Sequence, residues 1–306
     1  MTLFEIAQKY PDEETCKNIW KQYRDNAGVT CRRCEGTEHY WKNGKEVYQC
    51  KCCGTRTSLK SGTVMHASNL SFRDWFWTMA IMTSTKNAFS AKEVQRQLKK
   101  KRYEPVWAMM HKIRAVMGLR DDLYELQGEV EMDEGFFTTA VYGYVELLRG
   151  RGSQKKSCVV VMAESEDVPE DERLRGKPIK RCRYFKLKMV HKVNAQSLVG
   201  KAVEHISESA VVTTDGLPAY NDLGHVVKEH KANKTPPKQA HKLLPWVHTA
   251  ISNAKGILRN IYRCIDEDFL ENYLNEYCYK LNRRHFKCLM DRVLVAGVNR
   301  KWNYLG

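Results

Sequence analysis

The sequence lacks the features of a membrane or secreted protein. The longest apolar runs in its 306 residues, such as residues 158–163, are far shorter than a membrane span. Residues 1–5 contain neither the basic nor the apolar segment of a signal peptide. The 11 cysteines are an odd number and do not suit a complete disulfide framework. We therefore predict a protein of the reducing cytoplasm.

Acidic residues are scarce relative to basic ones. Lys and Arg number 51 against 36 Asp and Glu, so the formal net charge is +15 and the sequence pI is near 9.3. This surplus favours a polyanionic partner, nucleic acid above all, although a basic enzyme that touches no nucleic acid remains the alternative. Hydrophobic residues make up 42% of the chain, which argues against disorder. The length allows one large domain or two to three smaller ones.

Four of the cysteines have the spacing of a zinc site. Cys31 and Cys34 form one Cys-x2-Cys pair, and Cys50 and Cys53 form a second after fifteen intervening residues. Four thiolates placed in this way can surround Zn²⁺ in a closed tetrahedron, which is a structural and not a catalytic arrangement. Cys52 is the odd neighbour and is not assigned as a ligand. We predict a zinc ribbon over residues 29–60, after a helical lead-in over residues 1–28.

Helix signals follow the cysteine-rich segment. Ser71 and Ser90 occupy N-cap positions before apolar-periodic segments, and Pro105 suits the first turn of a third helix. The predicted helices cover residues 71–82, 90–98 and 105–117, within a helix-turn-helix-like module over residues 68–120. A solvated basic face is the alternative to DNA contact here. The candidate DNA-binding residues are Lys99, Lys100, Lys101, Arg102, Lys112 and Arg114.

From residue 129 the pattern changes to that of an α/β domain. Apolar strand patterns alternate with amphipathic helix patterns, which is typical of a mixed sheet flanked by helices. We place this core at residues 128–265 and a C-terminal helical extension at 266–306. The predicted strands are 129–137, 157–163, 183–190 and 210–214, and the predicted helices are 195–206, 246–261 and 269–282.

Two aspartates end apolar strands in this core. Strand alternation places Asp133 on the same face as Glu131, with Glu134 on the other. Asp215 ends the later strand and precedes Gly216, so an Asp-Gly turn is the alternative to a metal-binding role. In the following helix, His248 and Lys255 are seven residues apart and share a face. Asn253 lies about 140° from His248 around that helix and points elsewhere.

Several segments together resemble the zinc-ribbon branch of bacterial insertion-sequence transposases, which have a DDE-type, RNase H-like core. The resemblance spans most of residues 30–290 in the family's order. One departure is the segment after Asp133 and Glu134, where Gly135 begins a sequence unlike the family's usual Thr-Tyr-x-Gly-Gly turn. Besides the cysteine pairs, the resembling segments are GEVEMDEGFF, VVTTDGLPAY, LPWVHTAISNAKGILRNIY and YLNEYCYKLNRR.

The resemblance implies roles for individual residues. Asp133 and Asp215 match the two family aspartates that hold Mg²⁺ or Mn²⁺, and Lys255 matches the family lysine that contacts DNA phosphate. The third metal residue is Glu in many members and Asn or His in others. We assign it to His248 and keep Asn253 as the alternative. Arg283 and Arg284 are further candidates for clamping the DNA backbone, with a salt bridge to Glu276 or another acid as the alternative.

The resemblance also implies the activity. Such an enzyme binds the terminal inverted repeats of its element, cleaves them and joins them to target DNA by metal-dependent in-line displacement. It would act as a homodimer on double-stranded DNA, associated with the bacterial nucleoid. Because His248 stands where many relatives carry a carboxylate, a DNA-binding protein with an inactive core is one alternative. A metal-dependent nuclease without strand transfer is another.

Overall fold

The computed structural model describes residues 2–142, 153, 155–173, 175–176, 179–233, 243–262 and 264–299. The chain divides into two compact units: unit 1 comprises residues 1–120 and 285–306, and unit 2 comprises residues 121–284. The predicted extension at 266–306 is thereby divided between the units, and its residues from 300 onward lie outside the described ranges. No helix among the described residues is long and apolar enough to cross a membrane.

Unit 1 begins with helices α1 (Leu3–Lys9) and α2 (Glu13–Ala27), followed by a small antiparallel sheet. Its strands are β1 (His39–Lys42), β2 (Val47–Cys50) and β3 (Arg56–Ser58), with the short 3-10 helix η1 (Asn43–Lys45) between the first two. β2 is the central strand, with β1 and β3 on either side. This three-stranded sheet beside the paired cysteines has the form of a zinc ribbon.

The remaining helices of unit 1 are α3 (Phe72–Ser84), α4 (Ala91–Gln97), most of α5 (Glu104–Asp122) and α10 (Met290–Asn299). α3 starts where predicted because the Ser71 hydroxyl accepts the Asp74 N–H and the Asp74 carboxylate accepts the Ser71 N–H. Ser90 caps α4 in the same position, accepting the N–H of Glu93. α10 packs against α2 and α3, which is why the C-terminal segment belongs to this unit.

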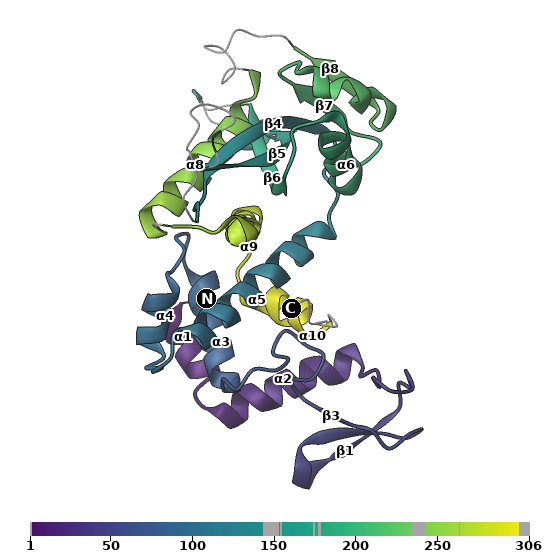
Figure 1. Cartoon of the computed structure of the whole chain (residues 1–306), viewed down its shortest axis with the longest axis vertical. Helices are drawn as coiled ribbons and strands as arrows, with labels where there is room; N and C mark the ends of the chain where they lie inside the picture. Colours follow the sequence, from purple (N-terminus) through teal and green to yellow (C-terminus); the bar gives the residue numbers. More distant parts are fainter. Residues whose placement is uncertain are drawn as a thin grey trace. The chain divides into compact units, whose positions relative to one another are not determined.

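Unit 2 is built on a five-stranded mixed sheet with the order β6-β5-β4-β7-β8 (Figure 1). β4 pairs antiparallel with β5, and β5 antiparallel with β6, whereas β4–β7 and β7–β8 are parallel. This order and these directions confirm the predicted RNase H-like sheet. The strands are β4 (Glu129–Thr138), β5 (Lys156–Asp167), β6 (Lys180–Val190), β7 (Val211–Thr214) and β8 (Glu229–Ala232).

Strand β8 is absent from the strands predicted above, because residues 228–242 have the composition of a polar connecting stretch. Its sequence, Glu-His-Lys-Ala, lacks the apolar alternation of a buried strand, and its residues are exposed or only partly buried. β8 is an edge strand that pairs with β7 alone, so it needs no apolar face of its own. Residues 234–242 lie outside the described ranges.

Helices cover both faces of the sheet and divide the apolar core in two. α8 (Pro245–Ile261) and α9 (Glu267–Asn282) pack on one face against Phe137, Val161 and Leu187. On the other face, α6 (Ala195–His205) and the 3-10 helix η3 (Pro218–His225) pack against Met132 and Val160. A further 3-10 helix, η2 (Glu170–Glu172), lies between β5 and β6 in the sequence. The alternation along β4 therefore decides which helix each of its side chains meets.

Candidate active site

The two aspartates lie on neighbouring parallel strands. Asp215 directly follows the last residue of β7, whereas Asp133 lies within β4, which continues to Thr138, so the prediction that Asp133 ends its strand is wrong. β4 and β7 pair in the register Glu131 opposite Thr213, and two further residues along each strand lead to Asp133 and Asp215. Both carboxylates therefore reach the same level of the sheet. Asp133 is held by a bond from the Glu134 N–H to its Oδ1 atom at 2.8 Å. Asp215 accepts the Leu217 N–H at 3.0 Å, in the turn that Gly216 completes with a φ of 80°.

Helix α8 packs along the face of β4 that carries Glu131 and Asp133. Glu131 accepts the N–H groups of Trp246 and Val247, at 2.8 and 3.0 Å, and so caps the start of the helix. A carboxylate at this position also interacts favourably with the helix dipole. Burial raises the pKa of Glu131 to about 7, against the effect of the two amide donors. Glu131 is thus the residue that anchors α8 to the strand carrying Asp133.

One turn into the helix, His248 faces the first aspartate. Its Nε2 atom lies 3.9 Å from Oδ2 of Asp133, and the aspartate side chain is largely buried while that of His248 is partly buried. Asn253, the alternative third residue, is exposed, and its side chain interacts with the hydroxyl of Tyr277 on α9. The two candidates therefore occupy different sides of α8, and only His248 meets an aspartate.

The close approach of α8 to β4 depends on Gly135. A Cβ at this position would lie 3.1 Å from Cε2 of Phe137 on the same strand, and 3.2 Å and 3.3 Å from two side-chain atoms of Ile251 on α8. Such contacts are tighter than those of normal packing, so a larger residue would require the side chains of Phe137 and Ile251 to shift. Gly135 stands two residues after Asp133, and Ile251 stands three after His248. The glycine after Asp133 and Glu134 therefore lets His248 come within reach of Asp133.

Lys255 continues this series of contacts at the next turn. Its Nζ atom lies 5.5 Å from the centre of the Phe137 ring, a cation–π geometry. The pKa of Lys255 is lowered, first by partial burial and then by the positive charges of Arg259 and Lys156. From Glu131 to Phe137, alternate residues of β4 thus meet successive turns of α8. The carboxylates of Glu131 and Asp133, the imidazole of His248 and the ammonium group of Lys255 therefore lie along the contact between β4 and α8.

A further carboxylate that the sequence reasoning did not assign lies beside the aspartates. Burial raises the pKa of Glu134 to about 7, the Tyr220 hydroxyl opposes the rise, and the charges of Asp133 and Asp215 add to it. Tyr220 comes from η3 and is fully buried. The signal in the sequence is the adjacent Asp-Glu pair. Tyr220 belongs to the core on the face opposite to α8, so Glu134 lies on the face that strand alternation predicts for it.

The donor set suits a hard divalent cation. Carboxylate oxygens are the protein ligands that Mg²⁺ and Mn²⁺ prefer, and an imidazole binds many divalent transition metals. Asp133 and Asp215 each have one oxygen in a local backbone hydrogen bond, which orients the carboxylate. The residues present therefore fit the metals expected for a DDE-type core.

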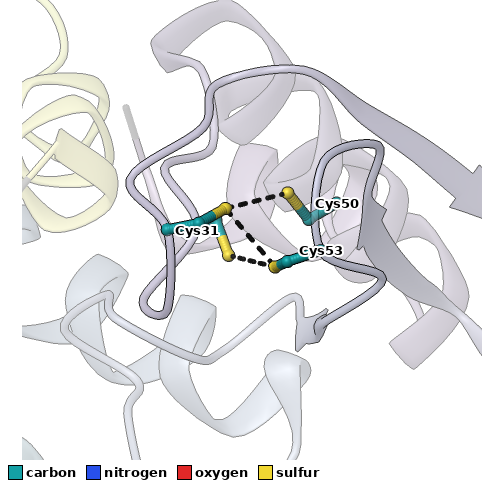
Figure 2. Close-up of side chains that lie close together, drawn as sticks. Cys31, Cys50 and Cys53 are labelled. Carbon is teal, nitrogen blue, oxygen red and sulfur yellow. Dashed lines mark hydrogen bonds between the residues drawn. The ribbon is translucent and has the colours of Figure 1, made fainter.

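The four predicted zinc ligands come together in unit 1. The Sγ atoms of Cys31, Cys34, Cys50 and Cys53 all lie within 4.8 Å of one another. Figure 2 shows the sulfurs of this cluster converging from two turns. Hydrogen bonds from Thr55 lower the pKa of the Cys53 thiol to about 6, which favours the thiolate that zinc binds. The cluster is consistent with a zinc ribbon and does not include Cys52.

The turns of the cluster impose their own backbone conformations. Gly54 has a φ of 71°, as expected for the residue after the second cysteine pair, and Glu35 after the first pair has a φ of 57°. Gly36 is constrained by packing, because a Cβ there would lie 3.1 Å from the Cys52 sulfur and 3.5 Å from that of Cys34. These short-range features form the site within a single segment of the chain.

The predicted basic run lies between α4 and α5. Lys99, Lys101 and Arg102 are exposed, whereas Lys100 forms an ion pair with Asp74 at 2.8 Å. Lys112 on α5 is partly buried, and its ammonium group donates to the backbone carbonyl of His66 at 2.7 Å. Of the candidate DNA-binding residues on α5 and in the basic run, Lys99, Lys101 and Arg102 therefore have side chains that are open to solvent.

The prediction that Arg114 contacts DNA is wrong, because its side chain is fully buried at 1% exposure. His111 on α5 is buried as well, although both residues fall outside the apolar stripe that the sequence indicated. The periodicity of a helix predicts one buried face, whereas the buried residues of α5, which include Met110 and Val116, extend beyond that face.

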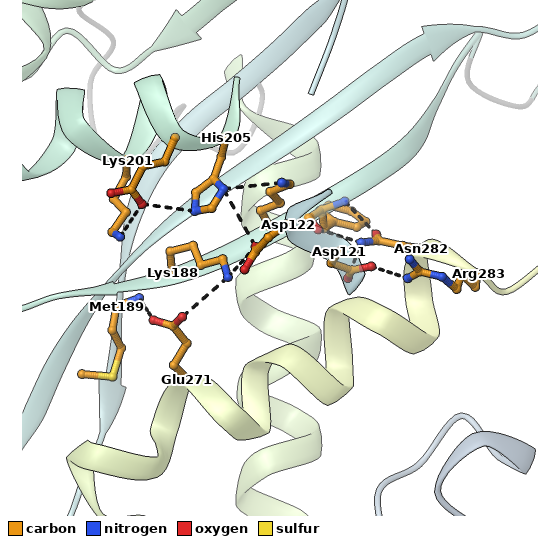
Figure 3. A network of polar contacts seen from close by, with 12 residues as sticks. Asp121, Asp122, Lys188, Met189, Lys201, His205, Glu271, Asn282 and Arg283 are labelled. Carbon is orange, nitrogen blue, oxygen red and sulfur yellow. Dashed lines mark hydrogen bonds and ion pairs between the residues drawn. The ribbon is translucent and has the colours of Figure 1, made fainter. Parts of the chain in front are cut away.

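The prediction for Arg283 is also wrong. Its guanidinium is 4% exposed and forms an ion pair with Asp121, which Asn282 also contacts (Figure 3). Releasing a buried, paired charge to bind phosphate would leave Asp121 unpaired at high cost. Arg284 donates to the backbone carbonyls of Leu281 and Cys182, at 2.9 and 2.7 Å. Both arginines therefore hold the end of α9 within unit 2.

Comparisons with known proteins give one family match and several similarities to solved structures. The sequence profile of the ISXO2-like transposase domain matches residues 125–282, and no curated protein matches the chain. Among solved structures, the Mos1 mariner paired end complex with Mn is 13% identical, covering 71% of this chain and 76% of that chain, with a TM-score of 0.29. A pre-cleavage Mos1 transpososome is 12% identical over the same shares, with a TM-score of 0.26.

Similarity to solved structures at such low TM-scores does not establish a family. The family match, in contrast, covers just over half of the chain and includes both aspartates, His248 and Lys255. This chain belongs to the ISXO2-like transposase family.

Proposed function

We propose that the chain is a transposase that binds the ends of its insertion sequence, cleaves them and joins them to target DNA. The observation that supports the proposal is the approach of His248 on α8 to Asp133 on β4, 3.9 Å apart, in a chain of the ISXO2-like family whose second aspartate, Asp215, follows the neighbouring parallel strand.

Asp133 and Asp215 would hold Mg²⁺ or Mn²⁺, with His248 as the third ligand. The bound metals would polarise the attacking and leaving oxygens of a phosphoryl transfer. The chain's own residues then have distinct tasks. Glu131 fixes the start of α8, so that His248 stays beside Asp133. Lys255, farther along that helix, would bind a phosphate of the same DNA strand.

Unit 1 would supply most of the affinity for DNA. The zinc ribbon formed by Cys31, Cys34, Cys50 and Cys53 would hold one Zn²⁺ as a structural ion. The exposed Lys99, Lys101 and Arg102 would bind backbone phosphates, so the affinity should fall steeply with salt. Transposition joins two ends, and we propose that a homodimer holds them.

The third ligand provides the decisive test. Substituting His248→Ala should reduce Mn²⁺ affinity and cleavage at least ten-fold, whereas Asn253→Ala, on the same helix, should change neither by more than two-fold. His248→Glu should restore metal binding, because it adds a carboxylate at the same position. Mn²⁺ affinity is measured by calorimetry and cleavage on duplexes made from the DNA that flanks the gene. Full activity in His248→Ala with loss in Asn253→Ala would reverse the assignment.

The imidazole at position 248 also favours a second candidate, a DNA-binding protein whose core is inactive. A neutral imidazole brings less negative charge to the site than a carboxylate and would hold the cations more weakly. Such a protein would bind the flanking DNA without cleaving it in Mg²⁺ or Mn²⁺. Cleaved but never joined products would instead identify a nuclease without strand transfer.

A further inference from the structure

Unit 2 has a pocket of about 290 Å³ next to Lys255, beyond the residues assigned to the metals. Its walls come from the end of β4, the last turns of α8 and the segment that follows α8. The lining residues are Phe137, Thr138, Lys255, Leu258, Arg259, Tyr262 and Ile265.

The lining combines positive charge with apolar and aromatic surface. Lys255 and Arg259 contribute two cations, and Lys156 is near enough to act on the Lys255 ammonium group. No carboxylate belongs to the lining as far as the described residues show. Tyr262, Leu258 and Ile265 supply a flat aromatic ring and aliphatic walls. Basic and aromatic groups together are what proteins use to bind a nucleotide by its phosphate and its base.

The pocket lies at a defined distance from the proposed metal site. Lys255 follows His248 by seven residues on α8, about 10 Å at a rise of roughly 1.5 Å per residue. Phe137 follows Asp133 by four residues on β4, about 13 Å at roughly 3.3 Å per residue. α8 and β4 run side by side through this stretch, because Gly135 lies next to Ile251 and Phe137 lies next to Lys255. Both distances therefore measure the same separation, that between the proposed metal site and the pocket. At roughly 3.4 Å per nucleotide along a duplex, it corresponds to about three to four nucleotides, and to fewer in an extended strand.

The size of the pocket limits its occupant. Pockets for small organic ligands typically measure about 300–1,000 Å³, so this one is at the lower end and holds a single nucleoside. A paired duplex is too wide to enter it. We propose that the pocket receives one unstacked nucleotide of the DNA strand being cut, two to four nucleotides from the reacting phosphate. Its phosphate binds Arg259 and Lys255, and its base lies against Tyr262 and Leu258.

This inference rests on the proposed function and extends it by a site for the substrate. Taking one base out of the stack would fix the register of the strand relative to the metals. It would also separate the reacting phosphate from the rest of the duplex. The cost of unstacking, a few kcal/mol in other base-extruding enzymes, would be offset by contacts with the aromatic and aliphatic walls.

The experiment maps which nucleotide contacts the pocket. A series of duplexes from the DNA flanking the gene carries a single 5-iodouracil at successive positions near the cut site. After irradiation of the complexes with the full-length protein, the cross-linked residue is identified by mass spectrometry. We expect Tyr262 to be cross-linked most strongly from one position, two to four nucleotides from the cut. Cross-linking that is absent at Tyr262, or equal from all positions, would overturn the pocket assignment.

Variants with matched controls test the same site through cleavage. Thr138 is exposed at the mouth, so Thr138→Trp should fill the pocket, remove the Tyr262 cross-link and slow cleavage at least ten-fold. Val203→Trp, at a site 60% exposed on α6, is the control for an added indole. Arg259→Gln should weaken binding of the cleaved strand several-fold, compared with Lys192→Gln as a charge-matched control. Mn²⁺ affinity should stay within two-fold of the parent in all four variants.

The two proposals fail in different ways. If the parent protein never cleaves the DNA, the proposed function is wrong, whereas a positional maximum at Tyr262 would still support the pocket. If the parent cleaves and Thr138→Trp cleaves equally well, the pocket assignment is wrong and the proposed function stands.

Discussion

The chain contains two candidate metal sites that are formed in opposite ways. The four cysteines of unit 1 come from one short segment and converge through two turns with positive φ. The site in unit 2 takes Asp133, Asp215 and His248 from two strands and a helix far apart in the sequence. The first is therefore closed and locally encoded, whereas the second exists only when the sheet and α8 are in register.

The difference also concerns chemistry. Four thiolates are soft, charged ligands that surround Zn²⁺ completely and leave it no position for a substrate. Two carboxylates and an imidazole are harder donors and fewer, so metals held there keep positions open for DNA oxygens. A local site suits a structural ion, and an assembled site suits a reaction that needs precise geometry.

The largest effects should come from the aspartates. Asp133→Asn and Asp215→Asn should each reduce cleavage and joining at least a thousand-fold, because an amide cannot replace the carboxylate charge at the metals. Both variants should keep the parent's zinc content and thermal stability, since the two sites form independently. The measurements are gel assays of cleavage, metal analysis and thermal melting. Near-normal cleavage by either variant in Mg²⁺ would rule out the assignment.

Removing a zinc ligand should disturb unit 1 and spare the other site. Cys34→Ser should lose the single zinc ion per chain and the binding of element ends, because three thiolates hold zinc far less tightly than four. Cys52→Ser is the matched control and should retain both. Mn²⁺ affinity of unit 2 should be unchanged in the two variants. Zinc retained in Cys34→Ser would show that the cluster is not the site.

A smaller effect is expected where α8 meets β4. Gly135→Ala would press against Ile251 and should destabilise the packing by roughly 1–3 kcal/mol. Cleavage should fall about ten- to a hundred-fold, because His248 would move away from Asp133. Ile251→Ala removes two of the three close contacts of the added methyl group and leaves the one with Phe137, so the double variant should recover part of the lost activity. An equal loss in the single and double variants would mean that Gly135 acts through something other than this contact.

The smallest effect concerns the polar network beneath the sheet in Figure 3. Burial, followed by the charges of Lys186 and Lys188, lowers the pKa of His205 to about 4. The folded state therefore binds fewer protons than the unfolded state between about pH 6.5 and 4. Stability from this group is present above pH 6.5 and declines as the pH falls, by at most roughly 1.4 kcal/mol per unit.

The check is denaturant unfolding of the parent and His205→Gln between pH 7 and 4.5. The variant should show a shallower loss of stability on acidification. Identical pH profiles for the two proteins would exclude His205 as the source. Zinc release from the cysteines also depends on pH, so the transition of unit 2 is followed separately.

Several elements could be predicted from the sequence because their signals are local. Ser71 and Ser90 cap helices at the predicted positions, and alternation along β4 assigns Glu131 and Asp133 to one face. Strand β8 was not predicted, because an exposed edge strand has no apolar pattern in its sequence. The assignments of Arg114 and Arg283 to DNA failed because a sequence shows charge but not burial.

The cysteine cluster could be predicted from the sequence alone, because its spacing already implies the turns that bring four sulfurs together. The same holds for the end of β7 at Asp215, where an apolar run stops at an acid, but not for Asp133, since β4 continues to Thr138. Which residue of α8 lies next to Asp133 depends on tertiary packing, because the position of the helix is fixed by the capping by Glu131 and the contact at Gly135. Contacts between distant segments are fixed by packing across the sheet, and no local pattern of residues records them.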